Sequence, residues 1–164
     1  MEYATLNNGV KRPMAGIGPF LLSPDGAEAS VRSALQCGYR LSDTANAYVN
    51  EKAVGRAIQK SGVDRKDIFL ETKLWPSFYE QADAVDKTLE RLDTDYIDLL
   101  LIHQPFNDYY GTYRAMEEAY QAGKVRAIGV SNFYPDRLID LCRFVEVPPA
   151  VNQVECNVFF QQHK

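Results

Sequence analysis

The feature that most constrains the fold of this chain is a regular alternation of short apolar stretches with amphipathic helical patterns. The centres of the apolar stretches recur roughly every 25 to 30 residues, and one helical pattern separates each stretch from the next. The stretch at 96–102, Y-I-D-L-L-L-I, is the most continuous and is typical of a strand that is covered on both faces. The alternation therefore predicts repeated βα units around a parallel sheet.

Six strands are predicted along the chain, and a hairpin precedes them. The predicted strands are 14–18, 39–43, 68–73, 96–102, 125–130 and 151–154. Asn7-Asn8-Gly9 lies between two short extended stretches and is a turn signal, which predicts an N-terminal β-hairpin. Ser77 and Glu80 form a predicted capping box for the third helix. If the sheet curls into a barrel, right-handed crossovers place every helix outside it.

Composition excludes several classes of partner. The 164 residues carry a formal net charge of −4, so the sequence predicts no broad basic field for nucleic acid or anionic lipid. Cys37, Cys142 and Cys156 are odd in number and lack metal-ligand spacing, which disfavours a disulfide framework and a zinc site. No apolar run approaches the length of a membrane span. We therefore expect one cytoplasmic domain without metal, membrane or nucleic-acid partners.

Polar side chains gather where the predicted strands end. Counting strands in chain order, Asp43 ends the second, Lys73 the third and His103 the fourth, while Ser131 and Asn132 end the fifth and Gln153 lies in the sixth. Taken singly, most have an ordinary explanation as a turn cap, a core histidine or a buried amide. In a βα barrel, however, all carboxyl ends of strands share one rim, where active sites are built. Their joint placement predicts a functional site.

Four of the residues suit proton delivery to a carbonyl oxygen. The phenol of Tyr48, in the loop after Asp43, is by itself a weak acid with a pKa near 10, and a neighbouring Lys73 ammonium is expected to lower that pKa. Asp43 would pair with Lys73 and hold it in place. A neutral His103 would hydrogen-bond the substrate oxygen and orient it. No side chain supplies hydride, so a nicotinamide cofactor is implied, with Ser131, Asn132 and Gln153 suited to hold its carboxamide.

Four segments of the sequence resemble signature segments of the aldo-keto reductases. They are G-Y-R-L-S-D-T-A-N-A-Y-V-N-E, L-E-T-K-L-W-P, D-L-L-L-I-H-Q-P and G-K-V-R-A-I-G-V-S-N-F, in the family's order. The resemblance implies a (β/α)8 TIM-barrel fold and reduction of aldehydes or ketones with NADP(H), NAD(H) being a further possibility. It implies a catalytic tetrad of Asp43, Tyr48, Lys73 and His103, nicotinamide contacts from Ser131, Asn132 and Gln153, and a substrate pocket lined by Phe20, Trp75 and His103.

The chain departs from the family pattern in two places. Pro19 stands where the family usually has threonine, so one cofactor contact is in doubt. The sequence stops at Lys164, shortly after the sixth predicted strand, whereas such barrels need about 250 residues. We therefore expect a single incomplete barrel over 1–164, truncated after about six strands. Open strand edges would favour a homo-oligomer, and weak NADPH binding with little turnover is expected.

Two other functions stay open at this point. The chain could be a catalytically weak or inactive barrel that serves as a binding or scaffold module. A phosphate-binding barrel isomerase is less favoured, because the sequence has no glycine-rich phosphate loop.

Overall fold

A five-stranded parallel sheet forms the centre of the protein, in the order β3-β4-β5-β6-β7. The computed structural model describes residues 1–79 and 81–162 of the chain. The strands of the sheet are β3 (Leu41–Asp43), β4 (Phe69–Leu74), β5 (Leu99–Ile102), β6 (Ile128–Ser131) and β7 (Asn152–Gln153). Each strand pairs in parallel with the next one along the chain, which confirms the predicted βα rhythm. The N-terminal hairpin is also confirmed, with β1 (Tyr3–Thr5) antiparallel to β2 (Lys11–Pro13).

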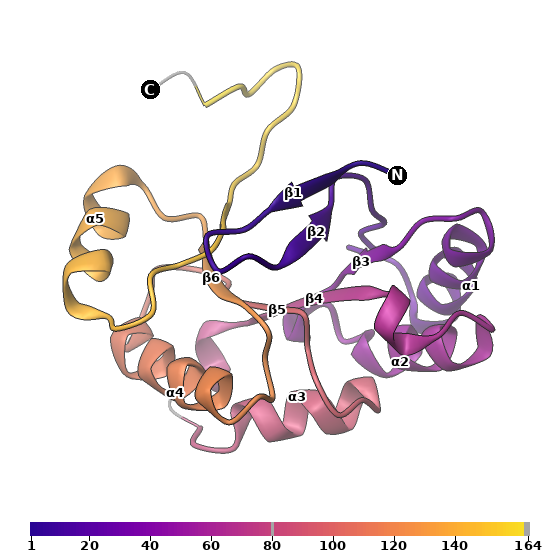
Figure 1. Cartoon of the computed structure of the whole chain (residues 1–164), viewed down its shortest axis with the longest axis horizontal. Helices are drawn as coiled ribbons and strands as arrows, with labels where there is room; N and C mark the ends of the chain where they lie inside the picture. The colour runs from indigo at the N-terminus through magenta and orange to yellow at the C-terminus, as the bar shows by residue number, and fades with distance from the viewer. Residues whose placement is uncertain (80, 163–164) are drawn as a thin grey trace.

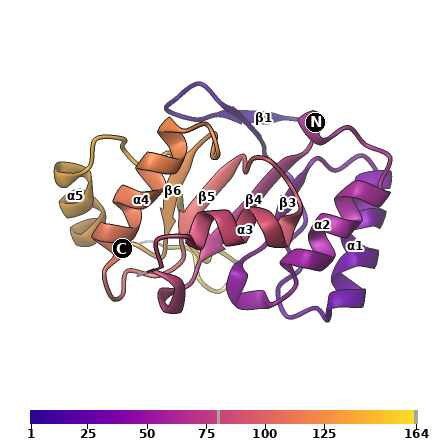
Figure 2. The same cartoon turned by 90° about the horizontal axis from the view of Figure 1, so that it is seen from below.

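Helices cover one face of the curled sheet, and the hairpin lies on the other side (Figure 1). The α-helices are α1 (Pro24–Gln36), α2 (Glu51–Lys60), α3 (Ala84–Leu92), α4 (Tyr109–Gln121) and α5 (Pro135–Phe144). The described residues also form the single-turn 3₁₀ helices η1 (Asn46–Tyr48), η2 (Arg65–Asp67) and η3 (Pro76–Phe78). Seen from the helix side, α2, α3 and α4 follow one another across the strands, as expected for part of a (β/α)8 barrel (Figure 2). No helix within the described ranges has the length and apolar character that crossing a bilayer requires.

Side-chain alternation in β5 divides the core into two layers. Leu100 and Ile102 are fully buried in the large cluster between sheet and helices, whereas Leu99 and Leu101 are fully buried in a smaller cluster on the concave face. Burying one such side chain stabilises the fold by about 1.5–3 kcal/mol. The continuous apolar run therefore reflects a strand buried on both faces, as the sequence predicted.

The predicted strand at 14–18 is reduced to a single bridging residue. The Ile17 N–H donates to the Leu41 carbonyl at 3.0 Å, and the Asp43 N–H donates to the Ile17 carbonyl at 2.9 Å. A Cβ on Gly16 would lie 2.5 Å from Leu41 Cγ, so glycine permits the close approach but gives the strand no side chain to pack. Ile17 thus covers part of the β3 edge.

The start of the third helix also differs from the prediction. A 3₁₀ turn, η3, occupies the position where the Ser77 capping box was expected, and α3 begins only at Ala84. Pro76 opens η3, which is a favoured place for proline because its fixed φ suits a first helical turn. Glu80, the second residue of the predicted box, lies outside the described residues.

The hairpin covers the end of the sheet where the strands begin. Asn8 donates from its side-chain amide to the Arg126 carbonyl, just before β6, at 2.9 Å. Asn7 donates to the Pro149 carbonyl, before β7, at 3.2 Å. This closure leaves the carboxyl ends of the strands as the accessible mouth.

The two edges of the five-stranded sheet are β3 and β7. Edge strands offer backbone groups to a second chain. Association of copies through these edges stays a prediction, which sedimentation at low micromolar concentration tests, and a stable monomer would contradict it.

Candidate active site

The centre of the mouth is a buried ion pair between neighbouring strands. Lys73 near the end of β4 is only 2% exposed, and its Nζ contacts Asp43 Oδ1 at the end of β3. The same ammonium donates to the Thr44 carbonyl at 3.0 Å. A buried ammonium is costly unless it is paired and hydrogen-bonded, and both conditions hold here. The apolar neighbours of Lys73 in F-L-E-T-K-L-W therefore indicated its burial correctly.

Tyr48 reaches the ion pair from the loop that follows β3. The loop is held by Asn50, whose Oδ1 accepts from Thr44 Oγ1 at 2.8 Å and whose amide donates to the Pro19 carbonyl at 2.9 Å. Val49 has a φ of 57°, a left-handed conformation that turns the chain from η1 into α2. The Tyr48 ring centroid lies 5.4 Å from Lys73 Nζ. Tyr48 and Lys73 are thus neighbours, as the sequence predicted.

Aromatic side chains line the mouth on both sides of Tyr48. The Phe20 ring centroid lies 4.9 Å from that of Tyr48. His103, which follows β5, packs edge-on against Tyr48 at 5.9 Å and against Trp75 at 4.9 Å. Phe20 and Trp75 are 58% and 37% exposed, so both present ring surface to a ligand. The structure therefore brings the predicted substrate-lining residues beside the predicted tetrad.

The predicted lowering of the Tyr48 pKa is wrong. Burial raises this pKa above its ordinary value of 10.0, the charge of Lys73 opposes the rise, and the carboxylate of Asp43 adds to it. The sequence indicates the ammonium, but the desolvation of the phenol and the effect of the nearby carboxylate on it depend on the folded chain. Tyr48 is consequently a neutral phenol that holds its proton at neutral pH.

His103 is held neutral by its surroundings. Burial lowers its pKa from 6.5 to about 4, and the positive charge of Lys73 acts in the same direction, while Asp43 opposes both. Its Nδ1 is buried and has no hydrogen-bond partner among the described residues. A neutral imidazole at the mouth agrees with the predicted form of His103.

The three predicted nicotinamide contacts lie together beside the ion pair. Asn132 Nδ2 donates to Ser131 Oγ at 3.1 Å and to the backbone carbonyl of His103 at 3.0 Å. Ser131 Oγ donates to the backbone carbonyl of Gln153 at 2.9 Å. Asn132 has a φ of 62°, a left-handed position that asparagine tolerates well. The side-chain oxygens of Asn132 and Gln153 accept no hydrogen bond from the described residues. The cluster therefore keeps acceptor atoms free for a ligand.

Sequence reasoning missed a second carboxylate and its cation. Glu71 in β4 is fully buried on the concave face, and Arg12 from β2 donates to its Oε2 through Nε at 3.0 Å and Nη2 at 2.8 Å. The signal was present in the sequence, because Glu71 lies two residues before Lys73 and so shares its face of the strand. Nothing in the sequence indicated Arg12 as the partner.

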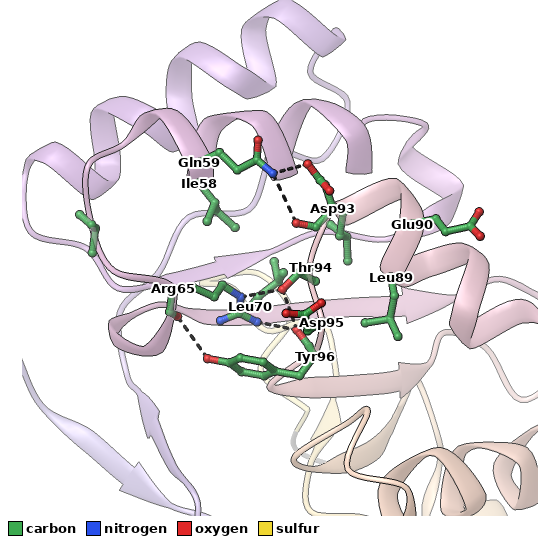
Figure 3. A pocket seen from close by; sticks show the side chains of 12 residues that line it. Ile58, Gln59, Arg65, Leu70, Leu89, Glu90, Asp93, Thr94, Asp95 and Tyr96 are labelled. Carbon is green, nitrogen blue, oxygen red and sulfur yellow. Dashed lines mark hydrogen bonds between the residues drawn. The ribbon is translucent and has the colours of Figure 1, made fainter.

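A separate hollow of about 580 Å³ lies at the opposite end of the strands, between α2 and α3 (Figure 3). Arg65 crosses it and donates to Thr94 Oγ1 at 3.0 Å and to the Tyr96 carbonyl at 2.7 Å. Its guanidinium also stacks on the Tyr96 ring, 4.0 Å from the centroid. Because these contacts satisfy the Arg65 guanidinium within the protein, we assign the hollow a structural role in joining α2 to the loop after α3, away from the Lys73–Asp43 pair.

A curled parallel sheet with outer helices and polar groups at the carboxyl strand ends places the chain among barrel-type α/β proteins. The model of the aldo/keto reductase family matches residues 16–164. The chain is 45% identical over 163 residues to morphine 6-dehydrogenase of Pseudomonas putida, covering 96% of this chain and 55% of that protein. It is 47% identical over 156 residues to glyoxal reductase of Bacillus subtilis (strain 168), covering 92% and 56%. The chain belongs to the aldo/keto reductase family.

Solved structures agree with this assignment. An aldo/keto reductase from Brucella melitensis matches with a TM-score of 0.94 and 44% identity, over 98% of this chain and 65% of that one. A Bombyx mori aldo-keto reductase in complex with NADP matches with a TM-score of 0.90 and 34% identity, over 95% and 58%. The chain thus spans a little over half the length of the curated relatives it matches.

Proposed function

We propose that this chain carries the proton-delivery site of an oxidoreductase that reduces aldehydes or ketones with a nicotinamide cofactor, with Tyr48 as the general acid. The observation that carries the proposal is the buried Lys73–Asp43 pair beside the Tyr48 ring at the mouth of the sheet. Similar proteins support it by name, since one is a glyoxal reductase and another was solved in complex with NADP. Reduction of a small carbonyl compound is the reaction class we assign.

The proton would come from Tyr48. Its raised pKa keeps the phenol protonated at neutral pH, so a proton is available whenever the substrate is bound. As the carbonyl oxygen takes that proton, negative charge develops on the phenol oxygen, and the Lys73 ammonium stabilises it. Neutral His103 would hydrogen-bond the same carbonyl oxygen and orient it. Asp43 positions Lys73 and does not itself exchange a proton in this scheme.

A nicotinamide supplies hydride when it is bound, and NADP(H) is the form we propose. The free side-chain oxygens of Asn132 and Gln153 fit the carboxamide of such a ring, because an amide N–H₂ group requires acceptors. Ser131 orients the Asn132 amide by accepting from its nitrogen, and it ties this turn to β7 by donating to the backbone carbonyl of Gln153. The acceptor atoms of these described residues therefore suit the group that the family implies.

The substrate would lie against the aromatic side chains of the mouth. Phe20, Trp75 and His103 surround Tyr48, so a carbonyl compound held among them has its oxygen near the phenol. A hollow of about 880 Å³ next to α2 and η3 is lined in part by Asn46, Val49 and Trp75. It shares Trp75 with the mouth, but none of the four tetrad residues lines it.

Replacing Tyr48 by phenylalanine tests the proposal. Tyr48→Phe removes the proton donor and keeps the ring, so carbonyl reduction should fall by about 10²–10⁴-fold. Glyoxal is a suitable substrate, and loss of NADPH fluorescence measures the rate. The matched control is Tyr39→Phe, because Tyr39 is 41% exposed and away from the mouth. Full activity in Tyr48→Phe would refute the role of Tyr48 as general acid. An inactive wild type would favour the binding or scaffold module instead.

A further inference from the structure

Glu71 occupies a position inside the sheet that proton delivery does not use. Its side chain is fully buried on the concave face, in the strand that also carries Lys73. Arg12 reaches it from the hairpin and makes two hydrogen bonds to Oε2. A buried carboxylate is retained only when it is paired, so Arg12 explains how Glu71 is tolerated. It does not explain what the second carboxylate oxygen does.

The second oxygen of Glu71 binds the Gln153 side chain. Gln153 Nε2 donates to Glu71 Oε1 at 2.9 Å and to Asp43 Oδ2, also at 2.9 Å. An amide nitrogen has two hydrogens, and here each is directed at a carboxylate. Flipping the amide would turn its oxygen toward two anionic groups, which is strongly unfavourable. The pair of carboxylates therefore fixes the amide with its nitrogen toward them and its oxygen away.

We propose that Glu71 is a positioning residue for the nicotinamide subsite, which acts with Asp43 to hold the Gln153 amide with its oxygen available to a primary carboxamide. The proposal rests on the proposed function in one respect, the assignment of Gln153 to the cofactor. It also connects the N-terminal hairpin to the candidate active site through a chain of contacts. Arg12 holds Glu71, Glu71 holds Gln153, and Gln153 in turn contacts the carboxylate that pairs with Lys73.

Glu71 is able to change its charge near neutral pH. Burial and the neighbouring Asp43 raise its pKa from 4.5 to about 7, while Arg12 and Lys73 oppose the rise. These three are the charged groups that face it from β2, β3 and β4. Protonation removes one of the two anionic acceptors from the Gln153 amide, which weakens the restraint on its orientation. The geometry of the amide should thus respond to pH through Glu71.

Nuclear magnetic resonance of the Gln153 side-chain amide tests the network without cofactor. Its signals are assigned by their loss in Gln153→Met and followed as a function of pH. We expect a transition with a midpoint of about 7 that disappears in Glu71→Gln. In Arg12→Met the midpoint should move upward, because the opposing cation is gone. A Glu71 carboxylate that did not act on the Gln153 amide predicts neither change, and the cofactor affinity described below separates positioning from a structural contact.

Asp98→Asn is the matched control for these spectra. Asp98 is also a fully buried carboxylate paired with arginine, but it has no contact with Gln153. Its replacement should leave the Gln153 transition unchanged. Absence of any transition near 7 in the wild type, or its persistence in Glu71→Gln, would overturn the proposal. If Glu71→Gln does not fold, the direction of the shift in Arg12→Met decides.

Cofactor binding gives the second measurement. At about pH 8, Glu71→Gln should raise the Kd for NADPH about tenfold, because the amide is no longer fixed by charge on both sides. The ratio of the two Kd values should approach one at about pH 6, where wild-type Glu71 is itself protonated. An equal Kd at both pH values would overturn the role in binding. If the wild type bound no NADPH while its Gln153 signals titrated as expected, the proposed function would fail and the orientation of the amide would stand.

Discussion

Two fully buried carboxylates, Asp98 and Glu71, lie on opposite faces of the same sheet and have different hydrogen-bond and charge partners. Asp98, on the helix side where β5 begins, accepts from Arg65 at 2.9 Å, from Arg126 at 2.6 Å and from the Leu70 N–H at 3.0 Å. Glu71, on the concave side, accepts from one guanidinium and one neutral amide, and it faces the carboxylate of Asp43.

The difference distinguishes the Asp98 carboxylate, which stabilises the fold, from the charged groups of the concave face, which lie at the candidate active site. At Asp98, two cations meet one carboxylate, and Arg126 remains about half exposed. On the concave side, two cations, Arg12 and Lys73, meet two carboxylates, and of these four groups Lys73 and Glu71 are almost fully buried. Groups with perturbed pKa values gather at functional sites, because burial and close like charges shift them there. The concave cluster shows this pattern through Glu71, and substitutions in the two clusters should therefore have different consequences.

Replacing Lys73 should have the largest effect. Lys73→Met removes the ammonium that stabilises charge on Tyr48, so carbonyl reduction should fall about 10³-fold. Asp98→Asn serves as the contrast, because it removes a buried charge from the other face and should keep kcat. Steady-state rates with glyoxal and NADPH measure both. Equal losses in the two variants would erase the distinction between the clusters.

The pH dependence of stability should report Glu71. Its folded pKa of about 7 lies above the ordinary 4.5, so the folded state holds a proton that the unfolded state has released between these values. The resulting stability is complete below about pH 4.5 and is lost as pH rises through 7, by about 3 kcal/mol. Urea unfolding of wild type and Glu71→Gln at about pH 5 and pH 8 measures the difference between them. A difference that does not change with pH contradicts the raised pKa.

Replacing Asp98 should cost stability alone. Asp98→Asn keeps an acceptor but loses the charge opposite two guanidinium groups, so we expect unfolding free energy to fall by about 2 kcal/mol. Urea midpoints with unchanged m-values measure this loss. A Kd for NADPH that moved with it would show that the two faces are coupled.

Replacing Arg126 should have the smallest effect. Arg126→Gln removes a cation that is 47% exposed, and Arg65 still pairs with Asp98. The loss should stay below about 1 kcal/mol, as for partly exposed ion pairs. The same urea titration at two salt concentrations checks it, and a loss as large as that of Asp98→Asn would show that Arg126 is the main partner.

The alternation of apolar runs was sufficient to predict five of the strands of the sheet and the hairpin before it. It failed at 14–18, where Gly16 allows a close approach to Leu41 and one residue, Ile17, pairs with β3. The same alternation placed Asp43, Lys73 and His103 at one mouth. It could not place Pro76 in a separate turn before α3, because proline suits the first turn of a long helix as well as of a short one.

The sequence alone determined which residues end which strands, since side-chain alternation and turn residues are local properties. Only the tertiary structure decided which charged groups lie in contact and how their pKa values shift. Arg12 and Glu71 are 59 residues apart, and Asp43 and Gln153 are 110 apart, yet each pair is in hydrogen-bond contact. Burial and Coulomb interaction depend on such distant neighbours, so the raised pKa of Tyr48 and the orientation of the Gln153 amide could be seen only once the chain was folded.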